Sequence, residues 1–449
     1  MARCYDDDSE TRIQTRTDGE RSAMTAAHNR LLPVAIALSA MAMPAQAQPL
    51  SEPVLAETPT GVWNQWRGPN RDGHCPGNWW PERLTKDRVK QLWRVELGPS
   101  YSGPIVDAST VYTTETVDKQ DEVVTAYDRQ TGKRKWRTSW AGSMKVPFFA
   151  AKNGSWIRST PAVDEDSVYV AGMLDVLVCL DKETGKERWR ADFVKRFNTP
   201  KPDFGFVCSP LVVGDHVYVQ AGASFVKVDK KTGETVWRSM KDGGGMFGSA
   251  FSSPTLATIA GKEQLLVQSR TELAGISIDD GEVLWSKKIR SFRGMNILTP
   301  QPYKDSVFIS AYGGRAHRFD ITADEGAFTA EEAWNNRAQA NMTSPVVIGK
   351  YAYLYLRAKR FACVNLESGE EVWRSSGMAD EYWSLIAQGK RMLALTEAGE
   401  LHLIKHNTED LKIVDTMQIS DGKTWAHLCA DGGQLIVREQ DGLVAYSWK

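Results

Sequence analysis

One short pattern recurs along most of this chain and restricts its fold more than any other feature. In its fullest form it reads Ala-Tyr-Asp-Arg-Gln-Thr-Gly over residues 126–132, with a tryptophan four positions later. Six copies can be aligned, and the tryptophan spacings from residue 136 to residue 334 are 53, 48, 48 and 49 residues. The tryptophans of the six copies are Trp136, Trp189, Trp237, Trp285, Trp334 and Trp373. Self-similarity at this period indicates a repeat architecture.

Each copy has the residue types of a β-hairpin. An apolar strand ends at Asp or Asn, a tight turn places Gly where φ must be positive, and the next strand carries the Trp. A further strand, rich in Val and aromatic residues, lies upstream, and in six units a proline precedes it, as is tolerated where a strand begins. This upstream strand occurs eight times, at residues 111–112, 168–170, 217–219, 265–267, 307–309, 353–355, 393–395 and 435–437.

Four short strands in about 45 residues, repeated eight times with almost no helical periodicity, predict an all-β fold. We predict an eight-bladed β-propeller of four-stranded antiparallel blades over residues 91–449. The last blade has no room for a Trp-bearing strand after residues 443–446. Residues 91–95 resemble residues 236–238, so we predict that they pair antiparallel with residues 443–447 and that Trp93 completes the set of docking tryptophans. Such closure would cover the free edges of the sheet.

The N-terminal region predicts export. Leu31 to Met43 form an apolar stretch of 13 residues, short of the roughly 20 that span a bilayer. Arg30 precedes this stretch and Ala-Gln-Ala follows at residues 45–47, so we predict a signal peptide over residues 1–47. Residues 1–23 are acidic and polar, which favours Met24 as the initiator. We therefore expect no transmembrane segment, a lead-in over residues 48–90, and a soluble location in the periplasm or cell envelope.

Charge and cysteine content exclude several classes. Removal of residues 1–47 leaves 50 basic and 50 acidic residues, so no global positive field favours nucleic acid as a partner. Five cysteines then remain, an odd and scattered set with no C-x-x-C motif for zinc. We interpret them as buried thiols. They are Cys75, Cys179, Cys208, Cys363 and Cys429.

The pattern Ala-x-Asp-x-x-Thr-Gly-x-x-x-Trp resembles the tryptophan-docking signature of the PQQ-like (quinoprotein-type) repeat family. That family includes quinone-dependent alcohol dehydrogenases and outer-membrane assembly scaffolds of the BamB type. The resemblance covers residues 90–449 and implies a propeller in which the seven tryptophans pack one blade on the next. Residues 63–73 also resemble the leader of exported members without an assigned function. Features of the dehydrogenases are missing: an adjacent cysteine pair, an Asp-Asn base motif, and a Glu/Asn pair for calcium.

Two motifs match catalytic or metal-binding patterns only formally. Residues 243–248 fit G-x-G-x-x-G, but a blade strand follows them where a dinucleotide site needs a helix. His402 and His406 have the spacing of a helical zinc pair, yet in a strand such positions are about 13 Å apart. We therefore predict no catalytic residue and no metal site.

Function in a propeller usually lies in the loops that gather at one mouth of the channel. We predict that two sets of loops meet there: those before each first strand, and those between second and third strands. Four arginines and several tryptophans at these positions could hold a planar or carboxylate-bearing ligand. The candidates are Arg158, Arg270, Arg315, Arg357, Glu115, Glu397, Glu439, Asn296, Asn341, Trp156, Trp383 and Trp425. The alternative is that they bind no ligand, and that they are solvated charges at the rim and aromatic residues that pack between blades.

These observations favour an exported, non-catalytic binding or scaffold propeller. Its expected partner is an envelope protein or a small anionic ligand at the channel mouth. One alternative is a divergent PQQ-dependent alcohol or sugar dehydrogenase, with PQQ and calcium as cofactors. A second alternative is a carbohydrate-binding propeller that uses the tryptophans of the mouth.

Overall fold

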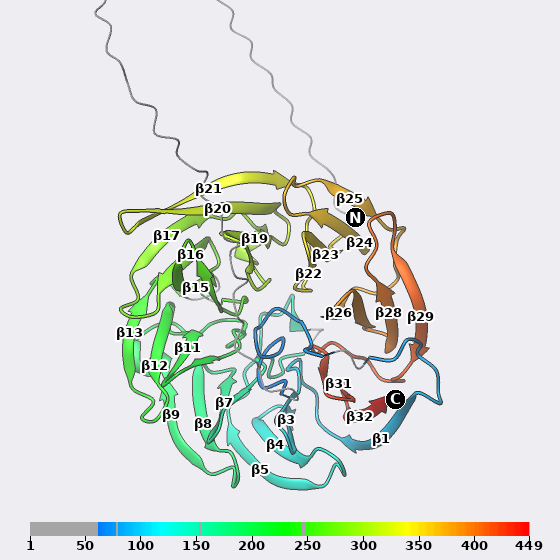
Figure 1. Cartoon of the computed structure of the whole chain (residues 1–449). Helices are drawn as coiled ribbons and strands as arrows, with labels where there is room; N and C mark the ends of the chain where they lie inside the picture. Colours follow the sequence, from blue (N-terminus) through cyan, green and yellow to red (C-terminus); the bar gives the residue numbers. More distant parts are fainter. Residues whose placement is uncertain (1–61, 78–79, 152–153, 245–247, 249, 449) are drawn as a thin grey trace, which may run out of the picture. The chain divides into compact units, whose positions relative to one another are not determined.

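Eight antiparallel sheets of four strands each follow one another around a central axis (Figure 1). The computed structural model describes residues 62–448 apart from 78–79, 152–153, 245–247 and 249. This arrangement confirms the predicted eight-bladed β-propeller. The predicted signal peptide over residues 1–47 lies outside the described residues.

In blades 1 to 7 the strands run outward from the axis in chain order, and in blade 8 the N-terminal strand β1 is the outermost. Blades 1 and 2 consist of β2 (Ile105–Val106), β3 (Thr110–Val117), β4 (Asp121–Asp128), β5 (Arg134–Ala141), β6 (Ala162–Val163), β7 (Ser167–Gly172), β8 (Val176–Asp181) and β9 (Glu187–Asp192). Blades 3 and 4 consist of β10 (Leu211–Val213), β11 (His216–Gln220), β12 (Phe225–Asp229), β13 (Thr235–Ser239), β14 (Thr255–Ile259), β15 (Lys262–Gln268), β16 (Glu272–Ser277) and β17 (Val283–Lys288).

The remaining blades follow the same order. Blades 5 and 6 consist of β18 (Gln301–Tyr303), β19 (Ser306–Ser310), β20 (Ala316–Asp324), β21 (Ala327–Asn336), β22 (Val346–Ile348), β23 (Tyr351–Leu356), β24 (Arg360–Asn365) and β25 (Glu371–Arg374). Blades 7 and 8 consist of β26 (Trp383–Gln388), β27 (Arg391–Thr396), β28 (Glu400–Lys405), β29 (Lys412–Gln418), β30 (Cys429–Asp431), β31 (Gln434–Arg438), β32 (Gly442–Trp448) and β1 (Val89–Glu96).

Burial explains the composition of the strands. The second and third strands of a blade are covered on both faces by the neighbouring blades, so β7 is buried along its whole length. The outer strand β5 is mostly exposed, and its Trp136 is the residue that turns inward and is buried. The sequence of a blade therefore changes from continuous apolar runs near the axis to polar segments with one Trp at the edge.

The repeated motif joins most blades to the one before them. In the first copy, Asp128 Oδ1 accepts hydrogen bonds from the backbone N–H of Thr131 at 2.9 Å and from its hydroxyl at 2.7 Å. The turn brings Gly132 to φ +70°, and a Cβ there would lie 2.7 Å from the ring of Trp93. Trp93 Nε1 also donates to the carbonyl of Arg129 at 3.0 Å. The Gly is thus required both by its backbone angle and by the tryptophan that packs on it.

The same indole-to-carbonyl bond recurs around the ring. It joins Trp136 to Lys182, Trp189 to Lys230, Trp237 to Asp279, Trp334 to Leu366 and Trp373 to Asn407. Trp285 differs, because its Nε1 donates to Gln264 Oε1 of its own blade at 2.6 Å. In the next blade, the copy of the motif that carries Trp334 has no equivalent turn, because β20 and β21 continue into a longer hairpin.

The ring closes as the sequence predicts. Strand β1 pairs antiparallel with β32, with Gln91 opposite Tyr446 and Val95 opposite Leu443. Beside this pairing, Arg129 of blade 1 forms a buried ion pair with Asp431 of blade 8, with 2.7 Å between Nη1 and Oδ2. Backbone and side chains therefore both cross the closing seam.

Few other elements interrupt the blades. Helix α1 (Phe193–Phe197) follows blade 2, and the 3-10 turn η3 (Phe292–Gly294) precedes blade 5. Within the described residues, no helix has the length and apolar character that crossing a membrane requires. The five cysteines of the described chain are free and buried.

Candidate functional site

The segment from Trp63 to Cys75, called the leader here, lies inside the ring of blades (Figure 1). Its backbone bonds to the innermost strands: Val106 N–H donates to the carbonyl of Trp63, and Val163 N–H to that of Asn64, both at 2.9 Å. At its other end Cys75 N–H donates to the carbonyl of Ala387 at 2.7 Å. The leader therefore ties blades 1, 2 and 7 together from inside the ring.

Two arginines of the leader reach further blades. Arg67 Nη2 donates to the carbonyls of Asp72 and Pro345, at 2.7 and 2.5 Å. Arg71 donates to the carbonyls of Pro210 and Ser209, at 2.7 and 2.9 Å. Both side chains are fully buried, and this burial lowers the pKa of Arg67 to about 10 and that of Arg71 to about 9. The guanidinium groups remain charged at neutral pH and are bonded to the loops that precede blades 6 and 3.

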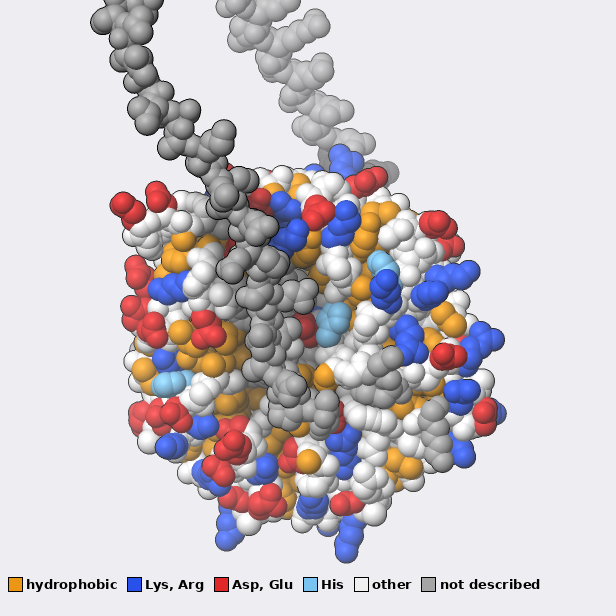
Figure 2. Space-filling view, in the orientation of Figure 1, with side chains coloured by type: hydrophobic (Ala, Val, Ile, Leu, Met, Phe, Trp, Pro, Cys, Tyr) orange, Lys and Arg blue, Asp and Glu red, His pale blue; other side chains and the backbone are white. Residues whose placement is uncertain are grey.

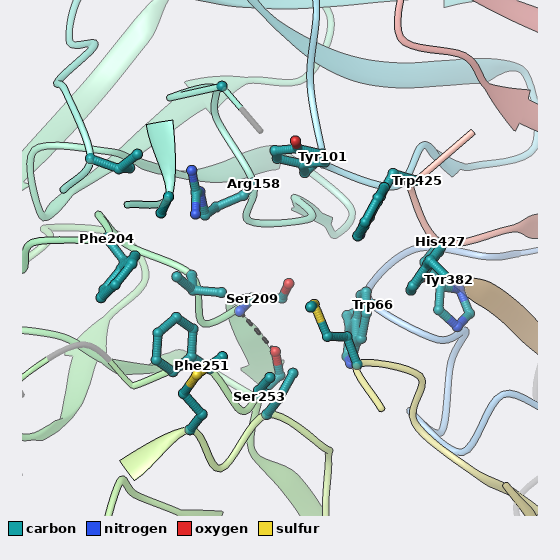
Figure 3. A pocket seen from close by; sticks show the side chains of 17 residues that line it. Trp66, Tyr101, Arg158, Phe204, Ser209, Phe251, Ser253, Tyr382, Trp425 and His427 are labelled. Atoms are coloured by element: carbon teal, nitrogen blue, oxygen red, sulfur yellow. Dashed lines mark hydrogen bonds between the residues drawn. The ribbon is translucent and has the colours of Figure 1, made fainter. Parts of the chain in front are cut away.

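A cavity of about 250 Å³ opens above the leader at the channel mouth (Figure 3). Its walls come from the loops that precede the first strand of each blade, and Trp66 of the leader forms part of it. The labelled side chains surround the space from all sides, and Ser209 N–H donates to Ser253 Oγ at 2.9 Å between two neighbouring loops. The lining residues are Trp66, Tyr101, Val146, Ala150, Gly154, Arg158, Phe204, Val207, Ser209, Phe251, Ser253, Met295, Ile297, Met342, Tyr382, Trp425 and His427.

Aromatic rings form most of the cavity wall. Trp425 stacks on Tyr382 with 5.6 Å between ring centroids and 7° between planes, and it meets Tyr101 edge-on at 6.0 Å. Trp66 lies 4.7 Å from His427 and donates from Nε1 to Thr299 Oγ1 at 2.9 Å. These contacts hold the rings in place before any ligand arrives, so the cavity is pre-formed.

Two of the lining side chains are titratable bases. Arg158 Nε donates to the carbonyl of Trp156 at 3.2 Å, and burial lowers its pKa to about 10, so the side chain is positively charged. His427 is neutral, because burial, aided by the nearby charge of Arg67, lowers its pKa to about 3. Among the described residues that line the cavity, Arg158 is the one cation, and the other lining side chains are mostly aromatic or aliphatic.

The structure brings only part of the predicted set into this cavity. Arg158 and Trp425 line it. Asn296 and Asn341 lie in the loops before first strands but are buried, and they fix neighbouring loops by donating to the carbonyls of Arg270 and Glu381, at 2.8 and 2.5 Å.

The other predicted arginines lie further from the axis. Arg357 lies 4.8 Å from the centroid of the Tyr312 ring, and Arg315 donates to Asn335 at 2.6 Å. Arg270 donates to the carbonyl of Arg293 at 3.2 Å. These side chains follow second strands, which lie outside the first strands in every blade. They therefore belong to the rim of the mouth rather than to its cavity.

The predicted acidic residues are engaged within the ring. Glu115 accepts a hydrogen bond from Gly98 N–H at 2.5 Å and faces Arg137 at 3.7 Å. Glu397 pairs with Lys423 at 3.1 Å, and Glu439 pairs with Arg94 at 2.9 Å. Acidic and basic side chains are interspersed around the edge of the face in Figure 2, in keeping with the net charge of the chain.

The two remaining tryptophans have packing contacts. Trp383 is buried, and it stacks on His402 of its own blade at 4.7 Å and on Tyr355 of blade 6 at 5.5 Å between ring centroids, so it packs between blades 6 and 7. Trp156 packs on Tyr101 at 5.4 Å, behind the wall. A row of tryptophans that could bind a sugar is therefore not assembled from the predicted set.

Exposed aromatic residues that sequence reasoning missed lie beside the cavity. Phe148 is 91% exposed, and Phe149 and Phe292 are 46% and 45% exposed. Arg293 lies 5.8 Å from the ring centroid of Phe149 and 5.2 Å from that of Phe292, and Arg357 lies 5.7 Å from the latter. We call these five residues the aromatic rim. The sequence signal for these exposed residues is the run Val-Pro-Phe-Phe-Ala at residues 146–150, which is apolar although it lies between blades.

The cavity does not fit a calcium-bound quinone. Calcium needs several oxygen ligands, usually including carboxylates. No Asp or Glu is among the described residues that line the cavity. Across the described part of the chain, no group of three or more His, Cys, Asp or Glu could hold a metal ion. The residues present thus disagree with the PQQ and calcium considered from the sequence.

Comparison with known proteins identifies the family of this propeller. A family model described as outer membrane protein assembly factor BamB matches residues 119–375, more than half of the chain. The chain belongs to this family. BamB from Moranella endobia (strain PCIT) is 20% identical over 386 residues, which cover 81% of this chain and 91% of that protein. BamB from Escherichia coli (strain K12) is 20% identical over 384 residues, covering 74% and 92%.

A solved structure shares the BamB fold with this chain. BamB from Moraxella catarrhalis superposes with a TM-score of 0.60 at 14% identity, covering 80% of this chain and 98% of that one. At this identity the likeness concerns the fold alone. It confirms the resemblance to PQQ-like, BamB-like repeat propellers that the docking motif predicts.

Proposed function

We propose that this protein is an exported, non-catalytic scaffold of the cell envelope that takes part in outer-membrane protein assembly. Membership of the BamB family and the likeness to BamB proteins over most of their length support this role. The observation that carries the proposal within this chain is the aromatic rim, which offers a partner an apolar and positively charged surface. We assign no reaction to the protein.

The aromatic rim has the properties of a docking surface. Seven large hydrophobic side chains of the described residues are exposed, and three of them are its phenylalanines. Phe148 and Phe149 contact each other with 5.7 Å between centroids, and Phe149 continues the contact to Phe204 of the cavity wall at 6.1 Å. Contiguous exposed apolar surface of this kind marks interaction sites in soluble proteins.

Charge indicates the chemistry of the partner. Arg293 and Arg357 lie against the phenylalanine rings and carry positive charge to the same surface. An apolar segment with acidic residues beside its hydrophobic side chains would match both features. We therefore propose that the aromatic rim docks an apolar, acidic segment of a partner protein in the assembly machinery.

Export is the second part of the proposal. The sequence predicts a signal peptide cleaved before Gln48, which would deliver residues 48–449 to the periplasm or cell envelope. Fractionation of cells that express the full chain should find the protein outside the cytoplasm. N-terminal sequencing of that material should begin at Gln48. Recovery from the cytoplasm with an intact N-terminus would contradict the proposal.

Deletion of the gene in its own host tests the scaffold role. We expect lower amounts of outer-membrane β-barrel proteins in the membrane fraction, measured by quantitative mass spectrometry, and recovery when the gene is restored. The amount of lipid-anchored or inner-membrane proteins provides the control. Unchanged β-barrel protein levels in the deletion strain would overturn the assembly role.

A further inference from the structure

The cavity inside the aromatic rim has a chemical character that docking alone does not require. It lies on the axis, behind the exposed phenylalanines, and is lined by five aromatic rings from Trp66, Tyr101, Phe204, Phe251 and Trp425, besides Tyr382 and His427. Its volume of about 250 Å³ accommodates a small planar molecule or one large side chain, but not a folded segment. The flat, pre-formed wall suits a planar aromatic ring better than a branched aliphatic group.

Arg158 supplies a charge that no carboxylate of the described residues neutralises. Within the described chain, its Nε donates to the Trp156 carbonyl, and its guanidinium lies 5.7 Å from the centroid of the Tyr101 ring. Neither contact is with a carboxylate. The terminal nitrogens of the guanidinium are therefore available for a ligand, and a guanidinium binds a carboxylate through two parallel hydrogen bonds.

The channel below adds to this positive field. Arg67 and Arg71 lie under the cavity, fully buried, and their hydrogen bonds go to carbonyl oxygens and to the amide of Gln65 rather than to carboxylates. Arg71 donates to the carbonyl of the lining residue Ser209 at 2.9 Å, and the charge of Arg67 helps to lower the pKa of the lining residue His427. Three guanidinium groups thus stand within or below a space that no described acidic side chain lines. An anion entering it gains attraction from all three in a poorly hydrated environment.

We propose that this cavity binds a small aromatic carboxylate, with the ring between Trp425, Tyr101 and Trp66 and the carboxylate on Arg158. Figure 3 shows Arg158 on one side of the cavity and Trp425 and Trp66 on the other, so one ligand can meet both. The same chemistry could come from a free metabolite or from the last residue of a polypeptide that ends in an aromatic amino acid. This inference goes beyond the docking function, since the aromatic rim can bind a partner whether or not the cavity is filled.

Isothermal titration calorimetry of residues 48–449 with indole-3-acetate tests the proposal. Indole-3-acetamide has nearly the same shape without the charge, and hexanoate has the charge without the ring. We expect saturable binding of indole-3-acetate, at least tenfold weaker binding of both analogues, and weaker binding of the acid as salt rises. Equal affinity for acid and amide, or no binding of the acid, would overturn the proposal.

Variants locate the binding to the cavity. Arg158→Gln should weaken indole-3-acetate binding by roughly 10-fold to 100-fold, the range expected for a charged hydrogen bond. Arg315→Gln, which changes a rim arginine outside the cavity, should leave the affinity within about twofold. If Arg158→Gln fails to fold, Trp425→Leu provides the second variant and should also weaken binding. Unchanged affinity in a folded cavity variant would contradict the proposal.

Two further arms separate the sources and the two proposals. A tripeptide Gly-Gly-Phe with a free carboxylate, compared with its amide, tests the chain-end source; selective binding of the free acid assigns that source. If indole-3-acetate binds but the tripeptide does not, the source is a free small molecule. Phe148→Asp, which alters the aromatic rim but not the cavity wall, should leave indole-3-acetate affinity unchanged. Failure of the docking function would therefore not be mistaken for failure of the cavity.

Discussion

The eight repeat units build both the seams at the outer edge, where one blade packs on the next, and the mouth of the channel. The outer seams use residues that recur in the repeats, whereas the mouth uses residues that differ from blade to blade. At the outer seams the same residues recur, and the indole of Trp136, for example, packs on Gly185 of the next blade just as Trp93 packs on Gly132. At the mouth each blade contributes a different residue, such as Arg158 from blade 2 and Trp425 from blade 8. Recurrence thus marks residues that hold the ring together, and divergence marks those left to meet other molecules.

The largest effect should come from opening the ring. Deleting residues 48–96 removes β1, Trp93 and the leader that bonds to blades 1, 2 and 7 from inside. We expect loss of a cooperative unfolding transition, measured by circular dichroism during heating. Deleting only residues 48–61 is the control, and this variant should melt like residues 48–449. A sharp, unshifted transition after the longer deletion would contradict the role of β1.

Replacing one tryptophan in each region should show that the outer seam contributes mainly to stability and the mouth mainly to binding. Trp136→Ala empties a buried docking site and should lower the free energy of unfolding by about 3–5 kcal/mol. Trp425→Ala removes a partly buried ring at the mouth and should cost about 1 kcal/mol while weakening ligand binding. Urea denaturation compares the two variants. Equal losses of stability would show that the mouth is as much a structural seam as the edge.

Near the mouth, the seam between blades 1 and 2 depends on a buried carboxyl group and should respond to pH. Glu122 accepts from Met173 N–H of the next blade at 2.6 Å and from Trp140 Nε1 at 2.9 Å. Burial raises its pKa to about 7 despite these bonds. The folded state therefore holds a proton that the unfolded chain releases near pH 4.3. Its contribution to stability is fully present below that pH and is lost as the pH rises through 7.

Glu122→Gln removes this titration. From pH 5.5 to pH 8, the unfolding free energy of the wild type relative to the variant should fall by about 2 kcal/mol, measured by urea denaturation at both values. A constant difference between the two proteins across this range would show that Glu122 does not titrate there.

The smallest effect comes from two glycines with similar backbone angles. Gly185 has φ +70° and a Cβ there would lie 2.5 Å from the Trp136 ring, whereas Gly349 has φ +60° and open space around it. Alanine at either position strains the backbone by about 1–2 kcal/mol. Gly185→Ala should cost about 1 kcal/mol more, because it also displaces Trp136. Equal costs in urea denaturation would mean that the Trp–Gly contact contributes little.

The ring was predictable because its contacts repeat. Trp, Gly and Asp at a fixed spacing are visible along the chain, and the closing strand is the one piece missing from the last unit. Trp285 is an instructive exception: its position follows the pattern, but its hydrogen bond stays within its own blade because the next unit lacks the turn. Whether a tryptophan of the repeat docks on the next blade therefore depends on the turn of that blade as well as on its own copy of the motif.

The cavity was only partly predictable because its contacts do not repeat. Arg158 and Trp425 were found from their place before a first strand. Arg270 and Arg315 were grouped with them, although loops after second strands lie further from the axis. Trp66 reaches the cavity through the leader, whose path back into the channel depends on bonds to residues more than two hundred positions away, such as Thr299. No local pattern encodes such a path.

Complementation of the deletion strain directly tests the division between a structural outer edge and a binding mouth. The double variant Phe148→Asp, Phe149→Asp alters the aromatic rim, whereas Val283→Asp alters a 42% exposed side chain on outer strand β17. Both should melt like the wild type. We predict that Val283→Asp restores the amount of outer-membrane β-barrel proteins and that the rim variant does not. Full restoration by the folded rim variant would contradict the account.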